Sequence, residues 1–146
     1  MPRTTAFFSA VPWRDFTASA QDWDSASVDG MATTLVLLHL VRAFEEAVLE
    51  LATEGLVHGP AHSSIGQEGG AVGSVLALRS DDQINGSHRG HYQFLAKALH
   101  HILPGGLAVD AGFDAPTMGL LRRSLAEIMG LAEGFCGGRG GSMHLR

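Results

Sequence analysis

Two polar loops with histidine side chains lie at the two ends of one predicted helix and are the clearest candidates for chemistry. The first loop contains His58 and His62, and the second reads Ser-His-Arg-Gly-His over residues 87–91. Imidazole groups can transfer protons near neutral pH. A guanidinium group at a helix start favours a phosphate or a carboxylate, because the first N–H groups of the helix point at the same ligand. Reactive side chains on loops held by a rigid scaffold are typical of a binding site.

The residue types alone leave two alternatives open. The stretch 58–91 could be only a helix with polar ends. Arg89 could pair with a neighbouring carboxylate, such as Asp81 or Asp82, instead of holding a ligand.

Several other catalytic patterns are excluded by their spacing. Neither the two histidines of the first loop nor the two of the second loop have cysteine or carboxylate partners at zinc-site spacing, so no metal site is predicted. Residues 140–144 lack the final glycine of a nucleophile elbow, and no P-loop pattern is present. Cys136 lies in a Gly-rich setting without an orienting partner, which indicates a free thiol.

The composition indicates one domain, or part of one. The 146 residues are 45% hydrophobic and 17% charged, which suits a packed core with some apolar surface left for a partner. The net charge of -5 and the absence of a long basic run argue against nucleic-acid binding. No apolar run reaches the length of a membrane span, no secretory signal is recognisable, and the single cysteine fits a reducing compartment. We therefore expect a cytoplasmic location.

The hydrophobic pattern predicts mainly helices. An amphipathic helix is expected over about residues 29–54, with Glu45 among its polar positions and Gly55 as its stop. Further helices are expected from Arg89 or Gly90 to residue 102, and from Pro116 to about residue 131 with Glu127 on its wet face.

The segment between the two polar loops is expected to be a helix followed by a strand. Ser64 and Gln67 have the spacing of a capping box, so a helix should start there and run to about Arg79. Its many small residues make it intrinsically weak and suit close packing. Residues 83–86 are the best strand candidate. The Gly-rich stretch 134–146 is expected to be a loop. Because loops of this type normally connect two elements, we expect the chain to be truncated.

Three motifs together resemble one known family. They read HSSIGQE at residues 62–68, INGSHRGH at 84–91 and GRGGSMHL at 138–145. In this order they resemble the α subunit, or α-like portion, of thiamin diphosphate-dependent 2-oxo acid dehydrogenase E1 components. The resemblance implies an α/β fold, of which this chain would be the N-terminal, helix-rich part with an incomplete sheet of one or two short strands. We expect an irregular, aromatic-bearing arm at residues 1–27 and a truncated thiamin diphosphate-binding domain at 28–146.

The resemblance also implies roles for five site residues. His62 looks like the family's catalytic histidine near the thiazolium ring and the substrate, and His144 introduces a loop at the entrance of the active site. Arg89 looks like the arginine that holds the cofactor diphosphate, and His91 like a histidine close to it. His88 stands where the family often has tyrosine, and it could still stack or hydrogen-bond in the cofactor pocket.

The function implied is that of an E1 dehydrogenase, which decarboxylates a 2-oxo acid and transfers the acyl group to a lipoyl carrier. The expected partners are a β-type E1 subunit or domain and a lipoyl-bearing E2 component, in an oligomer. The expected cofactors are thiamin diphosphate and Mg²⁺. The family's magnesium ligands have no counterpart here, so the chain alone is expected to be inactive. The alternatives are a non-catalytic fragment that acts as a subunit-interaction module, or an acetoin-cleaving E1 relative.

Overall fold

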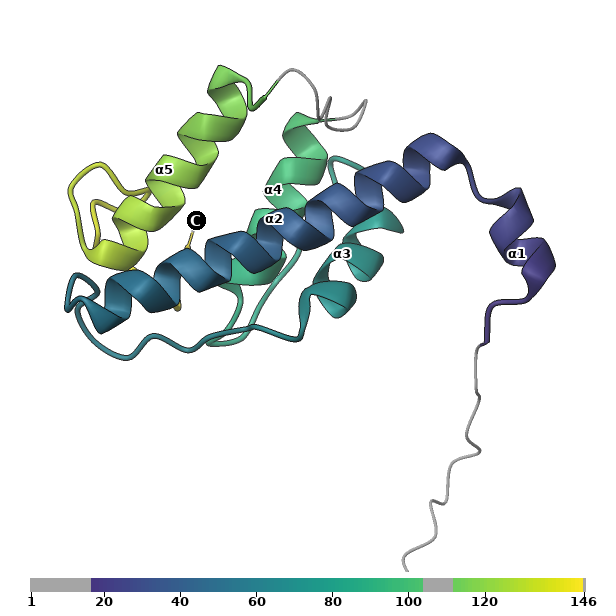
Figure 1. The fold of residues 1–146 in the computed structure, drawn as a ribbon. Coiled ribbons are helices and arrows are strands. Elements are labelled where there is room, and N and C mark those ends of the chain that lie inside the picture. The colour runs from purple at the N-terminus through teal and green to yellow at the C-terminus, as the bar shows by residue number, and fades with distance from the viewer. Residues whose placement is uncertain (1–16, 104–111, 146) are drawn as a thin grey trace, which may run out of the picture.

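The computed structural model describes residues 17–103 and 112–145, and its regular structure is helical (Figure 1). Within these residues no strand forms, and no helix is long and apolar enough to cross a membrane. The elements are α1 (Ala20–Ser25), α2 (Val28–Thr53), α3 (Glu68–Leu76), α4 (His91–Ile102) and α5 (Ala115–Met129).

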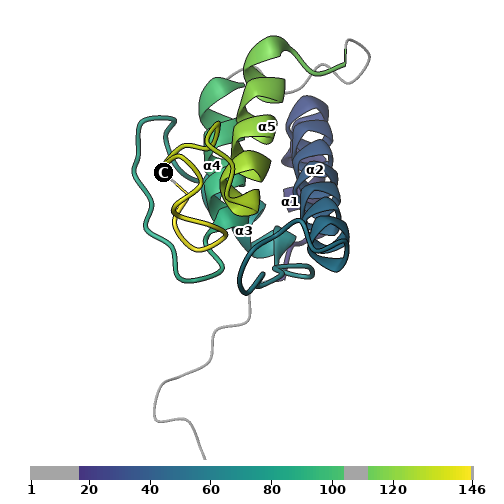
Figure 2. The same cartoon turned by 90° about the vertical axis from the view of Figure 1, so that its left-hand side faces the viewer.

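The long helix α2 is the support for the other helices. It contacts α3, α4 and α5, while α4 also contacts α3 and α5 (Figures 1 and 2). The helix begins at the cap Ser27, whose Oγ accepts the Gly30 N–H at 3.0 Å, and it is followed by Gly55 with a φ of 77°. The predicted helix and its glycine stop are therefore confirmed.

The core lies where the apolar faces of α2, α3 and α4 meet and α5 adds one side chain. Burial of each large aliphatic side chain contributes about 1.5–3 kcal/mol, so this cluster holds the bundle together. Its members are Leu37, Val41, Phe44, Val48, Ala71, Val72, Val75, Leu95, Ala96, Leu99 and Ile128.

Helix α3 differs from its predicted form at both ends. It begins at Glu68 and ends at Leu76, and its cap residue Gln67 makes no side-chain hydrogen bond. The predicted capping box is wrong because Ser64 is used in tertiary contacts. The Gly66 N–H is instead accepted by the carboxylate of Glu68, at 3.0 Å.

The small residues of α3 do not all serve close packing. Ala71 is fully buried, but a Cβ added at Gly69, Gly70 or Gly73 would have no neighbour within 4 Å. The glycine face of this helix is open in the described structure.

The predicted strand at residues 83–86 is not seen. This segment is an irregular connection, although its residue types suit a strand. A strand needs a neighbour for its backbone hydrogen bonds, and no neighbouring strand lies among the described residues. The chain at Gly86 instead packs closely against Gly90, leaving only 3.0 Å between a Cβ at Gly86 and the Gly90 Cα.

Two carboxylates expected on wet faces are buried. Glu45 of α2 and Glu127 of α5 both have 0% exposed surface. Glu45 follows Val41 by four residues and precedes Val48 by three, so it lies at the edge of the apolar face rather than opposite to it. The prediction failed because these side chains satisfy hydrogen bonds inside the protein.

Helix α5 starts as predicted, but it ends at Met129, before the predicted limit near residue 131. The Asp114 carboxylate accepts the Thr117 N–H at 2.9 Å, Pro116 lies in the first turn, and Gly130 ends the helix with a φ of 76°. Of the expected N-terminal arm, residues 1–16 lie outside the described residues. The remainder contains α1, which is capped by Ser19.

Candidate functional site

The three sequence motifs meet through hydrogen bonds between their loops. The Ser64 Oγ donates to the carbonyl oxygen of Arg89 at 3.3 Å, which joins the first motif to the second. The Ser142 Oγ donates to the carbonyl oxygen of Pro60 at 3.2 Å, which joins the third motif to the loop before the first. His91 Nδ1 lies 3.2 Å from the Ser142 carbonyl oxygen, so the second and third motifs are joined as well.

A buried carboxylate from α2 lies behind this junction. Glu45 Oε2 accepts the backbone N–H of Ser64 at 2.9 Å, and Oε1 lies 2.7 Å from His91 Nε2. His91 is 2% exposed and Glu45 0%. A single side chain therefore contacts two of the three motifs and reaches the third through the imidazole ring.

A second buried carboxylate organises the Gly-rich loop. Glu127 accepts the backbone N–H groups of Cys136 at 2.7 Å, Gly138 at 3.1 Å and Gly140 at 2.6 Å. Burial by itself raises the pKa of Glu127, but these donors outweigh it and the pKa is lowered. The conformation of the loop is thus held by hydrogen bonds to the Glu127 carboxylate and not by a regular ladder of backbone hydrogen bonds.

The Gly-rich loop also needs its glycines for space. A Cβ at Gly138 would overlap the backbone of Gly130, whereas a Cβ at Gly137 would meet nothing within 4 Å. Both residues have positive φ, 72° and 64°. The loop therefore packs against the end of α5 at Gly138, whereas the space beside Gly137 is open.

This contrast gives a prediction about stability. Gly138→Ala and Gly137→Ala should each be destabilised by about 1–2 kcal/mol through the left-handed conformation. Gly138→Ala should lose roughly 1–3 kcal/mol more, because its Cβ forces the two backbones apart. Urea denaturation of the full chain measures the difference. Equal stability of the two variants would contradict the close packing of Gly138 on Gly130.

An ion pair anchors the end of the first motif to α2. Arg42 Nε lies 2.5 Å from Glu68 Oε1, and the Glu68 side chain is 9% exposed. The hydrogen bond from Arg42 is the main reason that the pKa of Glu68 falls to about 2. Burial opposes the shift, and the Gly66 N–H supports it.

The lowered pKa of Glu68 predicts an acid-sensitive fold. Because the folded-state pKa is below the ordinary value of 4.5, the stabilisation is present above pH 4.5 and is lost as the pH falls towards about 2. We expect the free energy of unfolding to decrease in this range. Glu68→Gln should reduce that decrease, as should Arg42→Gln, and the double variant should add little. An unchanged pH slope in Glu68→Gln would contradict the assignment. Urea denaturation at a series of pH values provides the test.

His62 and His88 face each other across the first and second motifs. Their ring centroids are 5.1 Å apart and the rings are edge-to-face, with an interplanar angle of 77°. His62 Nδ1 is buried and has no hydrogen-bond partner among the described residues, while His88 is exposed. The pair therefore presents one imidazole with an unused polar atom next to a solvent-exposed one.

The start of α4 has features of an anion site. Its cap is Gly90, which offers no side-chain oxygen to the N–H groups of the first turn. Within the described residues, Arg89 makes no ion pair, and Asp81 and Asp82 instead lie 3.8 and 2.9 Å from Arg79. The pairing of Arg89 with these two carboxylates, which the sequence left open, is therefore not seen.

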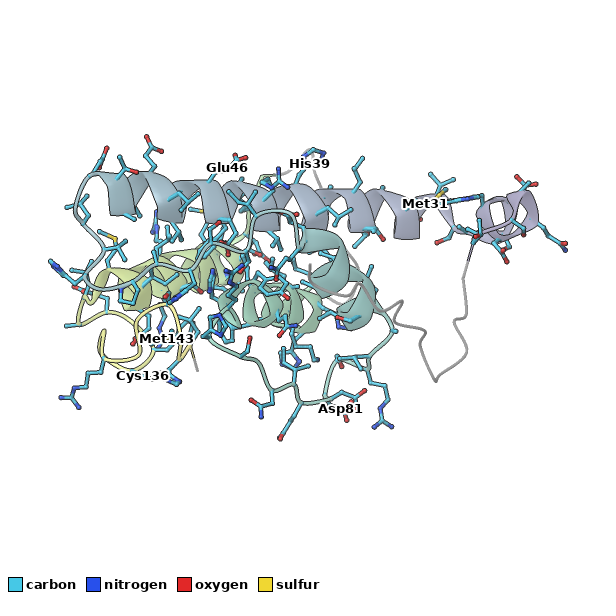
Figure 3. The ribbon with its side chains drawn as sticks, turned by 90° about the horizontal axis from the view of Figure 1, so that it is seen from below. Met31, His39, Glu46, Asp81, Cys136 and Met143 are labelled. Carbon is cyan, nitrogen blue, oxygen red and sulfur yellow. The ribbon has the colours of Figure 1, made fainter. Side chains whose placement is uncertain are left out.

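A cavity of about 250 Å³ adjoins this helix start and reaches the third motif. His144 thus lines the same cavity as residues of the second motif. Met143 lies beside it on the Gly-rich loop, on the opposite side of the molecule from His39 and Glu46 of α2 (Figure 3). The lining residues are Ile84, Asn85, Gly86, Ser87, Gly90, Phe94, Met143, His144 and Leu145.

The structure thus brings His62, His88, Arg89 and His91 into one region, with His144 on the neighbouring cavity wall. Residue types did not reveal the two buried carboxylates or the role of Ser142. The only signal for Glu45 was its place at the edge of an apolar arc. No group of three or more histidine, cysteine or carboxylate side chains is placed to hold a metal ion in the described part of the chain.

Comparison with known proteins shows the relationship. The chain is 37% identical over 105 residues to the α subunit of acetoin:2,6-dichlorophenolindophenol oxidoreductase of Bacillus subtilis (strain 168), covering 72% of this chain and 26% of that protein. It is 35% identical over 106 residues to the pyruvate dehydrogenase E1 component subunit α of Rhizobium meliloti (strain 1021), covering 73% and 25%. The mitochondrial pyruvate dehydrogenase E1 α subunit of Pisum sativum is 31% identical over 145 residues, covering 97% and 32%. No family model and no solved structure matches the chain.

These relatives are α subunits of oxidoreductases. More particularly, the chain is homologous to part of the E1 α subunits of the pyruvate and acetoin enzymes, which confirms the resemblance read from the three motifs. It spans about a quarter to a third of the length of these relatives.

Proposed function

We propose that the chain forms one wall of the thiamin diphosphate site of an E1 dehydrogenase. The complete enzyme would decarboxylate a 2-oxo acid and transfer the acyl group to a lipoyl carrier. The observation that carries the proposal is the junction of the three motifs at the start of α4, supported by the homology to E1 α subunits. Residues 28–146 would then be the helical part of an α/β domain whose sheet lies outside the described residues.

The residues at the start of α4 fit the anionic end of the cofactor. The uncapped first turn and the guanidinium of Arg89 offer donors and positive charge to a diphosphate. His88, which is exposed beside them, can add a hydrogen bond or a stacking contact. Both ring nitrogens of His91 lie within 3.2 Å of a protein oxygen, so we assign this residue to positioning its neighbours within the cofactor site.

The magnesium that accompanies the diphosphate would be bound by residues outside the described part of this chain. A β-type E1 subunit or domain would supply the opposite wall, and a lipoyl-bearing E2 component would receive the product.

We assign His62 to the chemical step. Thiamin diphosphate, when bound, would supply the nucleophilic carbon and the electron sink that decarboxylation of a 2-oxo acid needs. The His62 ring can donate a proton to oxygen or stabilise the charge that develops there, and it lies edge-to-face with the ring of His88. His144 would border the entrance to the site, in the cavity that residues of the second motif also line.

Acetoin cleavage is the second candidate reaction. The α subunit from Bacillus subtilis, whose name specifies acetoin as a substrate, is 37% identical to the chain over 105 residues. The roles proposed for Arg89 and His62 are the same for both reactions. Assay of the complete enzyme with a 2-oxo acid and with acetoin distinguishes them.

Arg89→Ala tests the proposed function. In the complete enzyme with its partner subunit, this variant should raise the Kd for thiamin diphosphate by about 10- to 100-fold, because hydrogen bonds to a charged group contribute about 1.5–3 kcal/mol. Isothermal titration with Mg²⁺ present measures the Kd. Arg122→Ala, an exposed arginine on α5, is the matched control and should change the Kd less than about twofold. An unchanged Kd in Arg89→Ala would refute the proposed site.

A further inference from the structure

The imidazole of His91 lies between two oxygen acceptors. Nδ1 is 3.2 Å from the carbonyl oxygen of Ser142, which can only accept, and Nε2 is 2.7 Å from Oε1 of Glu45. The ring is almost completely buried, so water cannot easily intervene. A neutral ring beside an ionised carboxylate would direct one nitrogen lone pair at an oxygen lone pair.

One additional proton removes this conflict, and one observed hydrogen bond together with the general basicity of imidazole favours the ring as its position. Glu45 Oε2 accepts the Ser64 N–H at 2.9 Å, and a hydrogen bond of this kind stabilises the ionised carboxylate. Imidazole is in general also a stronger base than a carboxylate. The buried unit would then have no net charge, and each ring nitrogen would carry a proton next to an oxygen acceptor.

We propose that Glu45 is a positioning residue that holds His91 as an imidazolium ion and thereby fixes the three motif loops relative to one another. Glu45 touches neither ligand nor cofactor in this scheme. Its Oε2 fixes Ser64, two residues after His62, while its Oε1 fixes His91, two residues after Arg89. Through the doubly donating ring it also fixes Ser142, two residues before His144.

The protonation state can be tested in the full chain without any cofactor. ¹⁵N NMR of the histidine side chains should show that both Nδ1 and Nε2 of His91 carry a proton at neutral pH. In Glu45→Gln, the amide group can donate to Nε2 and its oxygen can accept the Ser64 N–H, so the fold can persist with a neutral ring. Nε2 of His91 should then lose its proton, while Nδ1 keeps it.

Glu46→Gln is the matched control, because Glu46 is the next residue of α2 and is exposed on its outer face (Figure 3). It should leave both nitrogens of His91 protonated. An unprotonated Nε2 in the unsubstituted chain would overturn the inference, and so would a doubly protonated ring in folded Glu45→Gln. The first measurement decides the matter even if Glu45→Gln does not fold.

The consequence for the cofactor rests on the proposed function. In the complete enzyme, Glu45→Gln should raise the Kd for thiamin diphosphate by about 10-fold or more, as is common for residues that orient a ligand-binding group. Glu46→Gln should leave the Kd unchanged. An unaltered Kd in Glu45→Gln would overturn the positioning role of Glu45. If Arg89→Ala also left the Kd unchanged, the proposed site itself would fail, while the NMR result would still stand for the proton on His91.

Discussion

Glu127→Ala should lower the free energy of unfolding by roughly 3–6 kcal/mol, because it leaves three backbone N–H groups at the base of the Gly-rich loop without their acceptor. Each buried unsatisfied donor costs about 1–3 kcal/mol. Urea denaturation of the full chain measures the loss. Hydrogen exchange should show faster exchange at the amides of Cys136, Gly138 and Gly140.

Two further variants make the expectation for Glu127 specific. Glu133→Ala removes an exposed carboxylate a short distance further along the chain and should change stability by less than about 0.5 kcal/mol. Glu127→Gln retains one accepting oxygen and should fall between the alanine variant and the unsubstituted protein. A loss below about 1 kcal/mol in Glu127→Ala would show that the loop does not depend on this carboxylate. Because the pKa of Glu127 is lowered, its contribution to the free energy of unfolding is present at neutral pH and is lost on acidification below the ordinary pKa of a glutamate.

His62→Ala should lower the turnover of the complete enzyme by about 10²- to 10⁴-fold, the usual contribution of a general acid or base. The physical reason is that the ring offers a buried Nδ1 without a partner among the described residues, beside the start of α4. The Kd for thiamin diphosphate should change little. Steady-state kinetics together with titration of the cofactor separates the two quantities.

His39→Ala is the matched control for His62. His39 is exposed on the outer face of α2, away from the Gly-rich loop (Figure 3), so its loss should leave turnover unchanged. Turnover of His62→Ala within about threefold of the unsubstituted enzyme would refute a role in proton transfer. A large rise in the cofactor Kd with unchanged turnover would instead assign His62 to binding.

The apolar and exposed faces of the helices explain why the helices could be predicted, whereas the burial of Glu45 and Glu127 could not. The periodicity of Leu37, Val41, Phe44 and Val48 determines a helix with one buried face, and Gly55 marks its end because this residue adopts positive φ. Local rules place a glutamate on the wet side, since an unpaired carboxylate is costly to bury. Glu45 and Glu127 reverse that rule, because each finds hydrogen-bond donors inside the fold: Glu45 from the loop that holds Ser64, 19 residues away, and Glu127 from the Gly-rich loop that follows its own helix.

The strand and the capping box failed for a related reason. Both predictions used only residues close in sequence, whereas Ser64 bonds to Glu45 and Arg89, 19 and 25 residues away. Residues 83–86 suit a strand in type, but a strand forms only where a neighbouring backbone accepts and donates its hydrogen bonds.

For the candidate site, the sequence by itself identified the three motifs and the residues in them that have reactive side chains. These residues are His62, His88, Arg89, His91 and His144. The types and the order of these residues are enough to recognise the motifs, because both the reactive groups and the similarity to a family can be read from the sequence. Only the tertiary structure decided how the motifs are held, with Glu45 behind His91 and Glu127 beneath the Gly-rich loop. The contacts of Glu45 depend on tertiary packing, which brings its carboxylate to Ser64 and His91, and those of Glu127 depend on the way the Gly-rich loop folds back on the end of α5.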